Sequence, residues 1–170
     1  MLCVLFWSGN FVLGRFVHND IEPMELAFLR WFGVCIVLSP IFILQFKKIM
    51  KTITNHFILM FTYGLLGITA FNTLLYIGLQ DTTAVNALLI NSSVPILIVF
   101  MSAFILKLQV SNKQIVGIVL STLGVIFLVL KGDLSRITTL EFNIGDFWVI
   151  LTGFLWAFYT VILKFKPKEL

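Results

Sequence analysis

Residues 84–106 read AVNALLINSSVPILIVFMSAFIL and contain no charged side chain. Asp81 stands shortly before this stretch, and Lys107 follows it directly. A helix rises about 1.5 Å per residue, so a helix of this length crosses the roughly 30 Å hydrocarbon core of a bilayer. The stretch therefore predicts a transmembrane helix with one acidic end and one basic end.

The same pattern of apolar stretches between charged connections continues along the whole chain. Hydrophobic residues make up 59% of the sequence and charged residues 12%, whereas globular domains carry roughly 25% charged residues. The mean hydropathy is +1.04. The apolar stretches predict helices over residues 2–18, 24–45, 57–79, 83–106, 112–131 and 144–165. We therefore expect an all-α fold, a polytopic transmembrane helix bundle with about six spans.

The charges in the connections are sorted by sign. Every second connection holds lysines, namely Lys47, Lys48, Lys51, Lys107, Lys113, Lys164, Lys166 and Lys168. The other connections hold acidic residues, namely Asp20, Glu22, Glu25, Asp81, Asp133, Glu141 and Asp146. Because short cytoplasmic loops hold an excess of Lys and Arg, the lysine-rich connections are expected inside. This predicts a multi-pass protein of the cell membrane, plasma or inner, with both termini cytoplasmic.

The first and sixth predicted helices share a sequence pattern. The first contains FWSGNFVLGRF and the sixth contains LWAFYTVILKF. Each has a Trp after an apolar residue and a basic residue eight positions later, which pairs Trp7 with Trp156 and Arg15 with Lys164. Five helices separate the two starts, so the sixth helix would cross the membrane in the opposite direction to the first. Such an inverted repeat is common among secondary transporters.

The repeat divides the chain into three parts. Residues 1–131 are expected to form the first five-helix repeat, residues 132–143 an outer loop, and residues 144–170 the first helix of a truncated second repeat. The chain would thus hold about half of a ten-helix transporter.

Several motifs together resemble the EamA domain of the drug/metabolite transporter superfamily. They are Trp7-Ser8-Gly9-Asn10-Phe11 with Gly14-Arg15, Pro23 with Arg30, Leu75-Tyr76 with Gly78-Leu79, Ala84 with Ala87 and Pro95, Gly117 with Leu120 and Gly124-Val125, and Gly145-Asp146 with Trp156-Ala157 and Tyr159. The resemblance implies two inverted five-helix repeats around a central substrate cavity. It implies an exporter of small metabolites such as amino acids or drugs, working by alternating access. The absence of helices seven to ten leaves the alternative of a non-transporting fragment or an assembly partner of such a transporter.

The first and sixth predicted helices each carry a face of aromatic and polar residues. Trp7, Asn10 and Phe11 lie at helical spacing on the first helix, and Trp156 and Tyr159 lie on the sixth. We interpret these faces as candidate walls of the substrate cavity. The alternative is helix packing, with Asn10 bonded to a neighbouring helix.

Polar side chains also stand inside the second and third predicted helices. Arg30 lies about 10 Å below the outer start of its helix, where a charge is costly unless it faces a cavity or a partner. Arg30 is therefore a candidate substrate contact or part of an outer gate; the alternative is that it reaches back to Glu22 or Glu25 at the surface. Asn72 and Tyr76 lie one turn apart and should face protein or water rather than lipid.

Asn91 is a further candidate for the cavity wall. It stands near the middle of the fourth predicted helix and precedes Pro95, which frees a backbone carbonyl one turn earlier. Unwound backbone near the membrane midplane is where transporters often bind their substrates; the alternative is a kink that serves packing alone. Asn86 lies about 140° away around the helix axis, so the two amides cannot line one face.

Small residues form a stripe on the fifth predicted helix. Gly117, Ser121 and Gly124 recur at helical spacing and would let another helix backbone approach closely. We expect tight packing within the chain, and a homodimer seam is the alternative.

Other classes of protein are disfavoured by the composition. The basic residues are neither clustered nor interleaved with aromatic residues, so no nucleic-acid partner is expected. No group of His, Asp, Glu or Cys converges at one depth, so no catalytic residue, metal site, cofactor or enzymatic activity is expected. The expected partners are membrane lipid and a small-molecule substrate whose identity the residues do not specify. No acidic residue lies deep in a predicted span, so this part of the chain offers no obvious proton site.

Overall fold

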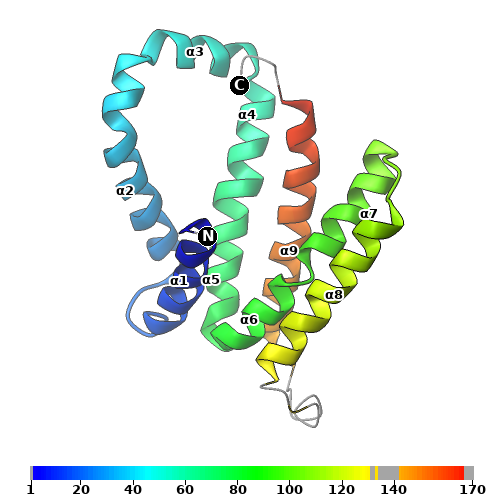
Figure 1. The fold of residues 1–170 in the computed structure, drawn as a ribbon. Helices are drawn as coiled ribbons and strands as arrows, with labels where there is room; N and C mark the ends of the chain where they lie inside the picture. The colour runs from blue at the N-terminus through cyan, green and yellow to red at the C-terminus, as the bar shows by residue number, and fades with distance from the viewer. Residues whose placement is uncertain (1, 131–132, 134–141, 167–170) are drawn as a thin grey trace.

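The computed structural model describes residues 2–130, 133 and 142–166, and every regular element among them is helical (Figure 1). The elements are α1 (Leu2–Phe16), α2 (Pro23–Leu44), α3 (Phe46–Asn55), α4 (Phe57–Gly64), the π-helix η1 (Leu65–Ala70), α5 (Phe71–Asp81), α6 (Ala84–Asn91), α7 (Val94–Leu106), α8 (Asn112–Val129), α9 (Ile144–Ile162) and the short 3₁₀-helix η3 (Leu163–Phe165). Most of the outer loop expected over 132–143 lies outside the described residues.

Four of the six predicted spans are confirmed by length and composition. They correspond to Pro23–Leu44, Phe57–Asp81, Ala84–Leu106 and Ile144–Phe165. Helices α1 and α8 also form where they were predicted, but they are shorter. The 15 residues of α1 extend about 22 Å at 1.5 Å per residue, less than the hydrocarbon thickness. Large apolar side chains are exposed along the bundle, including Phe28 and Phe104, as expected of faces that meet lipid.

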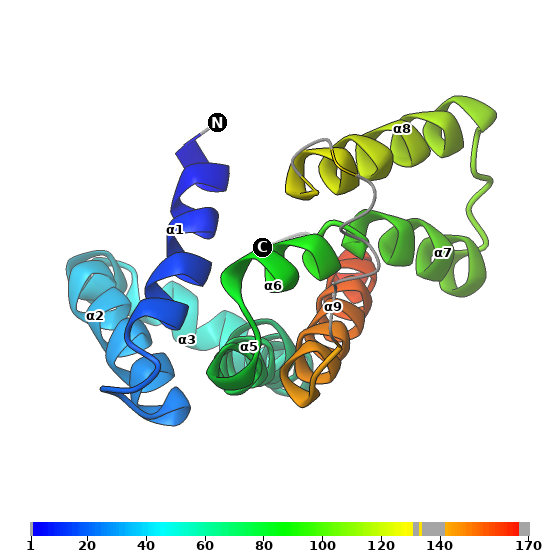
Figure 2. The ribbon, with the colours of Figure 1, turned by 90° about the horizontal axis from the view of Figure 1, so that it is seen from below.

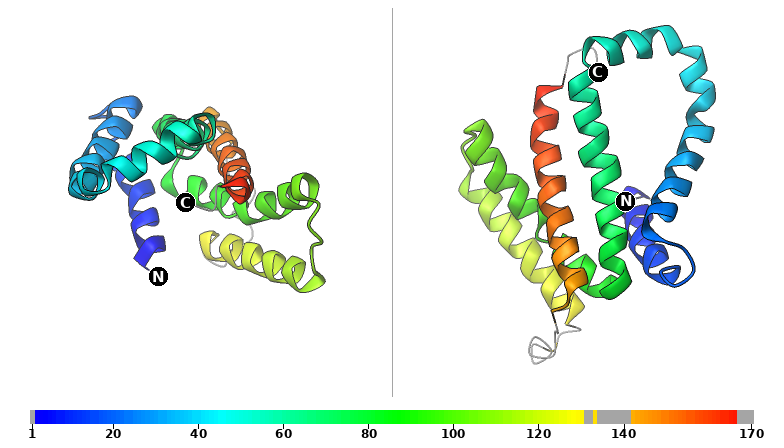
Figure 3. Two further views of the ribbon diagram at one scale, coloured as in Figure 1. Left: turned by 90° about the horizontal axis from the view of Figure 1, so that it is seen from above. Right: turned by 180° about the vertical axis from the view of Figure 1, so that it is seen from behind.

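The polar connection after α2 forms a helix of its own. Helix α3 bridges the ends of α2 and α4 and lies across them (Figures 1 and 3). Helical geometry places its apolar residues on one side and its three lysines on the other; the apolar residues are Phe46, Ile49, Met50 and Ile53, and the lysines are Lys47, Lys48 and Lys51. This division is typical of helices that lie in the plane of a membrane interface.

Two of the long spans contain an interruption. The span from Phe57 to Asp81 passes through the π-helix η1, and the span from Ala84 to Leu106 breaks between α6 and α7. At the break, the hydroxyls of Ser92 and Ser93 donate to the carbonyls of Leu89 and Ile90 at 2.6 and 2.7 Å. The same two carbonyls also accept the backbone N–H groups of Ser92 and Ser93 at 3.1 and 3.0 Å, so the break leaves neither of them unpaired.

Helix α9 occupies the centre of the described bundle. It packs against α5, α6, α7 and η1, and it runs beside α5 in Figures 1 and 2. Close approach is possible because Gly78 and Gly145 face each other, and a methyl group on Gly78 would come within 2.8 Å of the Gly145 carbonyl oxygen. The helix that resembles the start of a second repeat is therefore an integral part of the core.

The N-terminus of α9 is tied to the turn between α5 and α6. Asn143 and Asp146 form a capping box. The hydroxyl of Thr82 also donates to Asp146 Oδ1, and both side chains are buried. Thr82 therefore does not cap the following helix; Thr83 does, through its Oγ1 and the backbone N–H of Asn86 at 3.1 Å.

The prediction that the small-residue stripe of α8 packs tightly within the chain is wrong for the described residues. Methyl groups added to Gly117 or Gly124 would meet no atom within 4 Å, and Ser121 is exposed. Helix α8 instead faces α7 through residues such as Ile115 and Val119, across an apolar groove of about 280 Å³. The stripe lies on the opposite side of α8, which stands at the periphery of the bundle (Figure 2). The homodimer alternative stays a prediction.

Candidate substrate cavity

A cavity of about 440 Å³ lies among the helices at the level of their interruptions. Its wall contains residues of α1, α2, η1, α5, α6, α7 and α9, namely Trp7, Asn10, Phe11, Arg30, Trp31, Gly67, Ile68, Phe71, Asn72, Asn91, Val94, Pro95, Ile98, Trp156 and Tyr159. A volume of this size suits a small organic molecule. The wall combines aromatic rings, three Asn amides and one guanidinium.

Arg30 joins three helices through one of its nitrogens. Its Nη1 donates to Asn10 Oδ1 at 2.9 Å and to Asn72 Oδ1 at 2.8 Å. It also donates to the hydroxyl oxygen of Tyr76 at 2.9 Å. The Tyr76 hydroxyl in turn donates to Asn10 Oδ1 at 2.6 Å. Asn72 completes the network by donating from Nδ2 to the carbonyl of Ile68 at 2.7 Å.

These bonds decide between the two expectations for Arg30. Its hydrogen-bond partners among the described residues are neutral oxygens on α1 and α5. The alternative in which it reaches back to Glu22 or Glu25 is therefore not adopted. The side chain turns inward, where it lines the cavity and lies with its Cζ 5.9 Å from the ring centroid of Trp31.

The remaining nitrogens of Arg30 are open. Within the described part of the chain, Nε and Nη2 donate to no protein acceptor, since all three bonds leave from Nη1. Trp31 Nε1 is the one buried side-chain nitrogen or oxygen without a partner among the described residues. Nε and Nη2 of Arg30 also lack a partner but are not fully buried, so they keep access to solvent or to the cavity.

A cluster of aromatic rings also lines the cavity. The rings of Trp7 and Trp156 meet edge to face, with centroids 5.4 Å apart and planes at 80°. Trp156 also lies 4.8 Å from Phe71 and 5.2 Å from Tyr159, centroid to centroid. The two tryptophans that the sequence repeat paired are thus neighbours in space.

The two helix interruptions both contribute to the cavity wall. Gly67 of η1 lies so close to Tyr159 that a methyl group on it would come within 2.7 Å of the ring. Asn91 ends α6 directly before the break, and its side-chain amide bonds no described residue. Asn86 is absent from the wall, in agreement with the expectation that the two amides cannot share a face.

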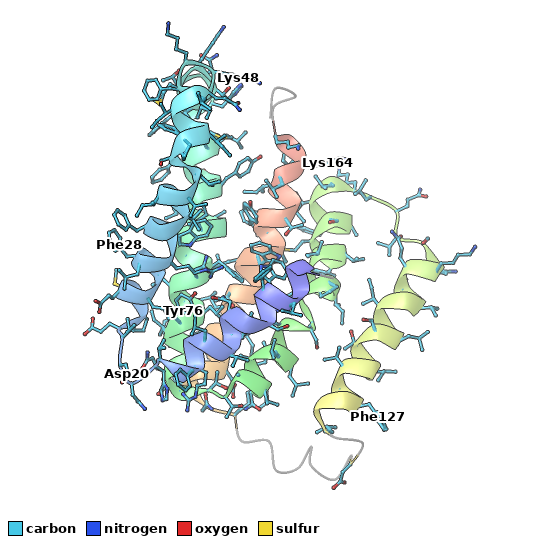
Figure 4. The ribbon with its side chains drawn as sticks, turned by 60° about the vertical axis from the view of Figure 1, so that its left-hand side comes forward. Asp20, Phe28, Lys48, Tyr76, Phe127 and Lys164 are labelled. Carbon is cyan, nitrogen blue, oxygen red and sulfur yellow. The ribbon has the colours of Figure 1, made fainter. Side chains whose placement is uncertain are left out.

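Most residues proposed from the sequence gather around this one space. Eight line it directly, namely Trp7, Asn10, Phe11, Arg30, Asn72, Asn91, Trp156 and Tyr159. Tyr76 is buried behind them and reaches Arg30 with its hydroxyl; it points from α5 toward the interior, whereas Phe28 points outward from α2 (Figure 4). Whether these residues bind a substrate stays a prediction.

Sequence reasoning missed Trp31, Gly67, Ile68, Phe71, Val94, Pro95 and Ile98. In a regular α-helix Gly67 and Asn72 would lie about 140° apart. The wider turn of the π-helix changes this register, so both residues reach the same cavity. The signal for Gly67 is its small size, which leaves room for a large ring. The sequence does not show which ring this is, because Tyr159 is distant from Gly67 in the chain.

Comparison with known proteins places the chain in a family. The model of the EamA-like transporter family matches residues 1–130. The uncharacterized transporter YyaM of Bacillus subtilis (strain 168) is 28% identical over 166 residues, covering 97% of this chain and 54% of that protein. An uncharacterized transporter of Archaeoglobus fulgidus is 30% identical over 166 residues, covering 95% of this chain and 54% of that protein. No solved structure matches significantly.

The chain spans about half the length of the curated relatives it matches. The family model and the relatives point to a transporter rather than an enzyme. Long apolar helices agree with a multi-pass membrane protein. The chain belongs to the EamA-like transporter family.

Proposed function

We propose that this protein carries small molecules out of the cell by alternating access around the cavity. One observation supports the proposal most directly. The cavity wall includes both places where long spans depart from regular α-helix, η1 and the break before α7. Secondary transporters commonly bind their substrates at discontinuous helices near the membrane midplane, because freed backbone groups and side-chain amides become available there.

The proposal includes the inverted-repeat organisation. Residues 1–131 form the first repeat, residues 132–143 an outer loop, and residues 144–170 the first helix of the second repeat. The edge-to-face contact of Trp7 with Trp156 supports this division, because equivalent residues of two inverted repeats meet near the axis that relates them.

The orientation proposed here places both termini in the cytoplasm of the cell. Lys48 and Lys164 lie at one end of the described helices and Asp20 at the other (Figure 4). This separation supports a cytoplasmic lysine-rich end under the positive-inside rule.

A flux measurement tests transport. The full polypeptide, purified and reconstituted, is placed in liposomes loaded with a defined mixture of amino acids, monocarboxylates and organic amines, and retained solutes are quantified by mass spectrometry. We expect at least one solute to leave at least tenfold faster than from protein-free liposomes. A protein that only assists another transporter would give no such loss, and that result would overturn the proposal.

A thiol block tests whether the flux passes through this cavity. The sequence has two cysteines, Cys3 and Cys35, so a C3S/C35S background is free of thiols. In it, Asn91→Cys places a thiol on the cavity wall, and the matched control Asn19→Cys places one on an exposed position between α1 and α2. A maleimide should stop flux through the first variant and leave the second unchanged. Equal inhibition of both variants would contradict a transport route through the cavity.

A further inference from the structure

The cavity contains a positive charge that no described residue neutralises. Arg30 is the one charged side chain among the described residues of the wall, and its protein partners are neutral oxygens. A charge at membrane depth is costly unless a partner or water compensates it. Neutral dipoles at Nη1 hold the guanidinium in place but leave the net charge of the cavity at plus one.

The open edge of Arg30 has the shape of an anion-binding fork. Nη1 is committed to Asn10, Asn72 and Tyr76, whereas Nε and Nη2 donate to no described acceptor and are not buried. These two N–H groups lie side by side in the guanidinium plane. A carboxylate accepts such a pair through its two oxygens in a bidentate arrangement, which a single-point donor such as Lys cannot reproduce.

The rest of the wall narrows the class of anion. The same wall also contains the rings of Trp7, Phe71, Trp156 and Tyr159, which favour a flat apolar body. A volume of about 440 Å³ accommodates one or two rings. The described wall has no Asp or Glu to pair with an ammonium group, so a monoanion fits better than a zwitterion or an amine.

We infer that the cavity takes an organic monocarboxylate with a flat apolar body, its carboxylate on the Nε and Nη2 edge of Arg30 and its ring against Trp7 and Trp156. The inference rests on the proposed function, since it names the substrate class of the same site. It assigns Arg30 two separate tasks: Nη1 joins the helices, and the other edge receives the solute.

Four probes with one ring test the inference by direct binding. They are phenylacetate, its neutral isostere phenylacetamide, the amine phenethylamine and the zwitterion phenylalanine. Binding to the full polypeptide in detergent is followed by quenching of tryptophan fluorescence, because Trp7, Trp31 and Trp156 line the cavity. We expect phenylacetate to bind at least tenfold more tightly than each of the others. Equal affinity for phenylacetate and phenylacetamide would overturn the inference.

A matched pair of variants locates the charge that matters. Arg30→Lys should reduce the preference for phenylacetate over phenylacetamide at least tenfold, because it keeps the charge and removes the fork. Arg15→Lys is the control: Arg15 also stands in a membrane helix, but its Nη1 donates to the carbonyls of Leu79 and Gln80 at 2.8 and 2.6 Å, away from the cavity wall. The preference should survive in this variant.

A measurement on the unaltered protein covers the case in which Arg30→Lys fails to fold. Phenylglyoxal modifies accessible guanidinium groups, and mass spectrometry reports which arginine has reacted. Phenylacetate should slow the modification of Arg30 but not of Arg15, and phenylacetamide should slow neither. Equal modification with and without phenylacetate would overturn the inference.

Binding and flux together separate this inference from the proposed function. If the liposomes lose phenethylamine or phenylalanine while phenylacetate does not bind, the protein is a transporter and the inference is wrong. If phenylacetate binds through Arg30 but no solute leaves the liposomes, the inference stands and the proposed function is wrong.

Discussion

At the level of single residues, Arg30 and the neutral oxygens around it connect α1, α2 and α5. The bonds from Nη1 range from 2.8 to 2.9 Å. Tyr76 supports the arrangement from behind, where its side chain is only 2% exposed. Hydrogen bonds to an ionised group are stronger than neutral ones, so this network should contribute to stability as well as to the shape of the cavity.

Tyr76→Phe tests the strength of the network, because it keeps the ring and removes the hydroxyl that joins Arg30 and Asn10. We expect the free energy of unfolding to fall by about 2 kcal/mol, the range for a bond to a charged group. Tyr63→Phe is the control, since the Tyr63 hydroxyl donates to the neutral carbonyl of Ile162 at 3.0 Å. It should cost about 1 kcal/mol or less. Both free energies are measured by denaturant unfolding in micelles. Equal losses in the two variants would contradict this ranking.

At the level of elements, the cavity depends on helices that depart from regular geometry. The π-helix η1 turns Gly67 toward Tyr159, and the break at Ser92 and Ser93 separates α6 from α7. Specific contacts accompany both departures: Gly67 fits against the Tyr159 ring, and the serine hydroxyls donate to the carbonyls of Leu89 and Ile90. Substitutions at these positions should therefore act on the element and not only on one contact.

Gly67→Ala is expected to destabilise the junction of η1 with α9. The added methyl would come within 2.7 Å of the Tyr159 ring, and such overpacking costs about 1–3 kcal/mol. Gly64→Ala is the matched control in the preceding turn, where an added methyl meets no atom within 4 Å. It should raise stability by about 0.5–1 kcal/mol, because Ala favours the helix. Thermal unfolding that ranked Gly64→Ala as the less stable variant would contradict this account.

Thr82→Val is expected to loosen the start of α9. It preserves the side-chain shape but removes the donor to buried Asp146, and an unsatisfied buried acceptor costs about 1–3 kcal/mol. Hydrogen exchange of the backbone amides in residues 146–150 should become faster. Thr83→Val removes the exposed cap of α6 instead and should leave this exchange unchanged. Similar exchange in both variants would show that Asp146 does not depend on Thr82.

At the level of the whole molecule, α9 brings the distant parts of the chain together. It packs against α5, α6, α7 and η1 (Figure 3) and carries Trp156 into the cavity beside Trp7. Charge is sorted along the same bundle, with Lys48 and Lys164 at one end and Asp20 at the other (Figure 4). The proposed orientation of the protein in the membrane therefore depends on how the whole bundle places these charges.

Cysteine accessibility tests the proposed orientation. In the C3S/C35S background, Asn19→Cys lies near Asp20, and Asn55→Cys lies at the end of α3 beyond its lysines; both positions are exposed. In intact cells an impermeant maleimide should label Asn19→Cys, whereas Asn55→Cys should react only after permeabilisation, because lysine-rich loops stay inside. The reverse pattern would contradict cytoplasmic termini.

Much of the fold and of the candidate wall follows from local properties of the sequence. Hydropathy and length predicted the four long spans because a bilayer acts on each segment directly. Helical spacing grouped Trp7, Asn10 and Phe11 on one face because their positions depend only on the helix that contains them. The shared pattern around Trp7 and Trp156 also indicated residues that the fold brings into contact.

The sequence by itself thus determined the membrane-spanning helices, the sorting of charge between connections and most candidate residues of the cavity. Only the tertiary structure decided that Arg30 bonds Asn10, Asn72 and Tyr76 rather than a nearby Glu, that Thr82 serves Asp146, and that the stripe of α8 faces outward. The physical reason is sequence distance. Arg30 lies 46 positions from Tyr76, and Thr82 lies 64 positions from Asp146, so packing of whole helices selects these partners and no local pattern contains them.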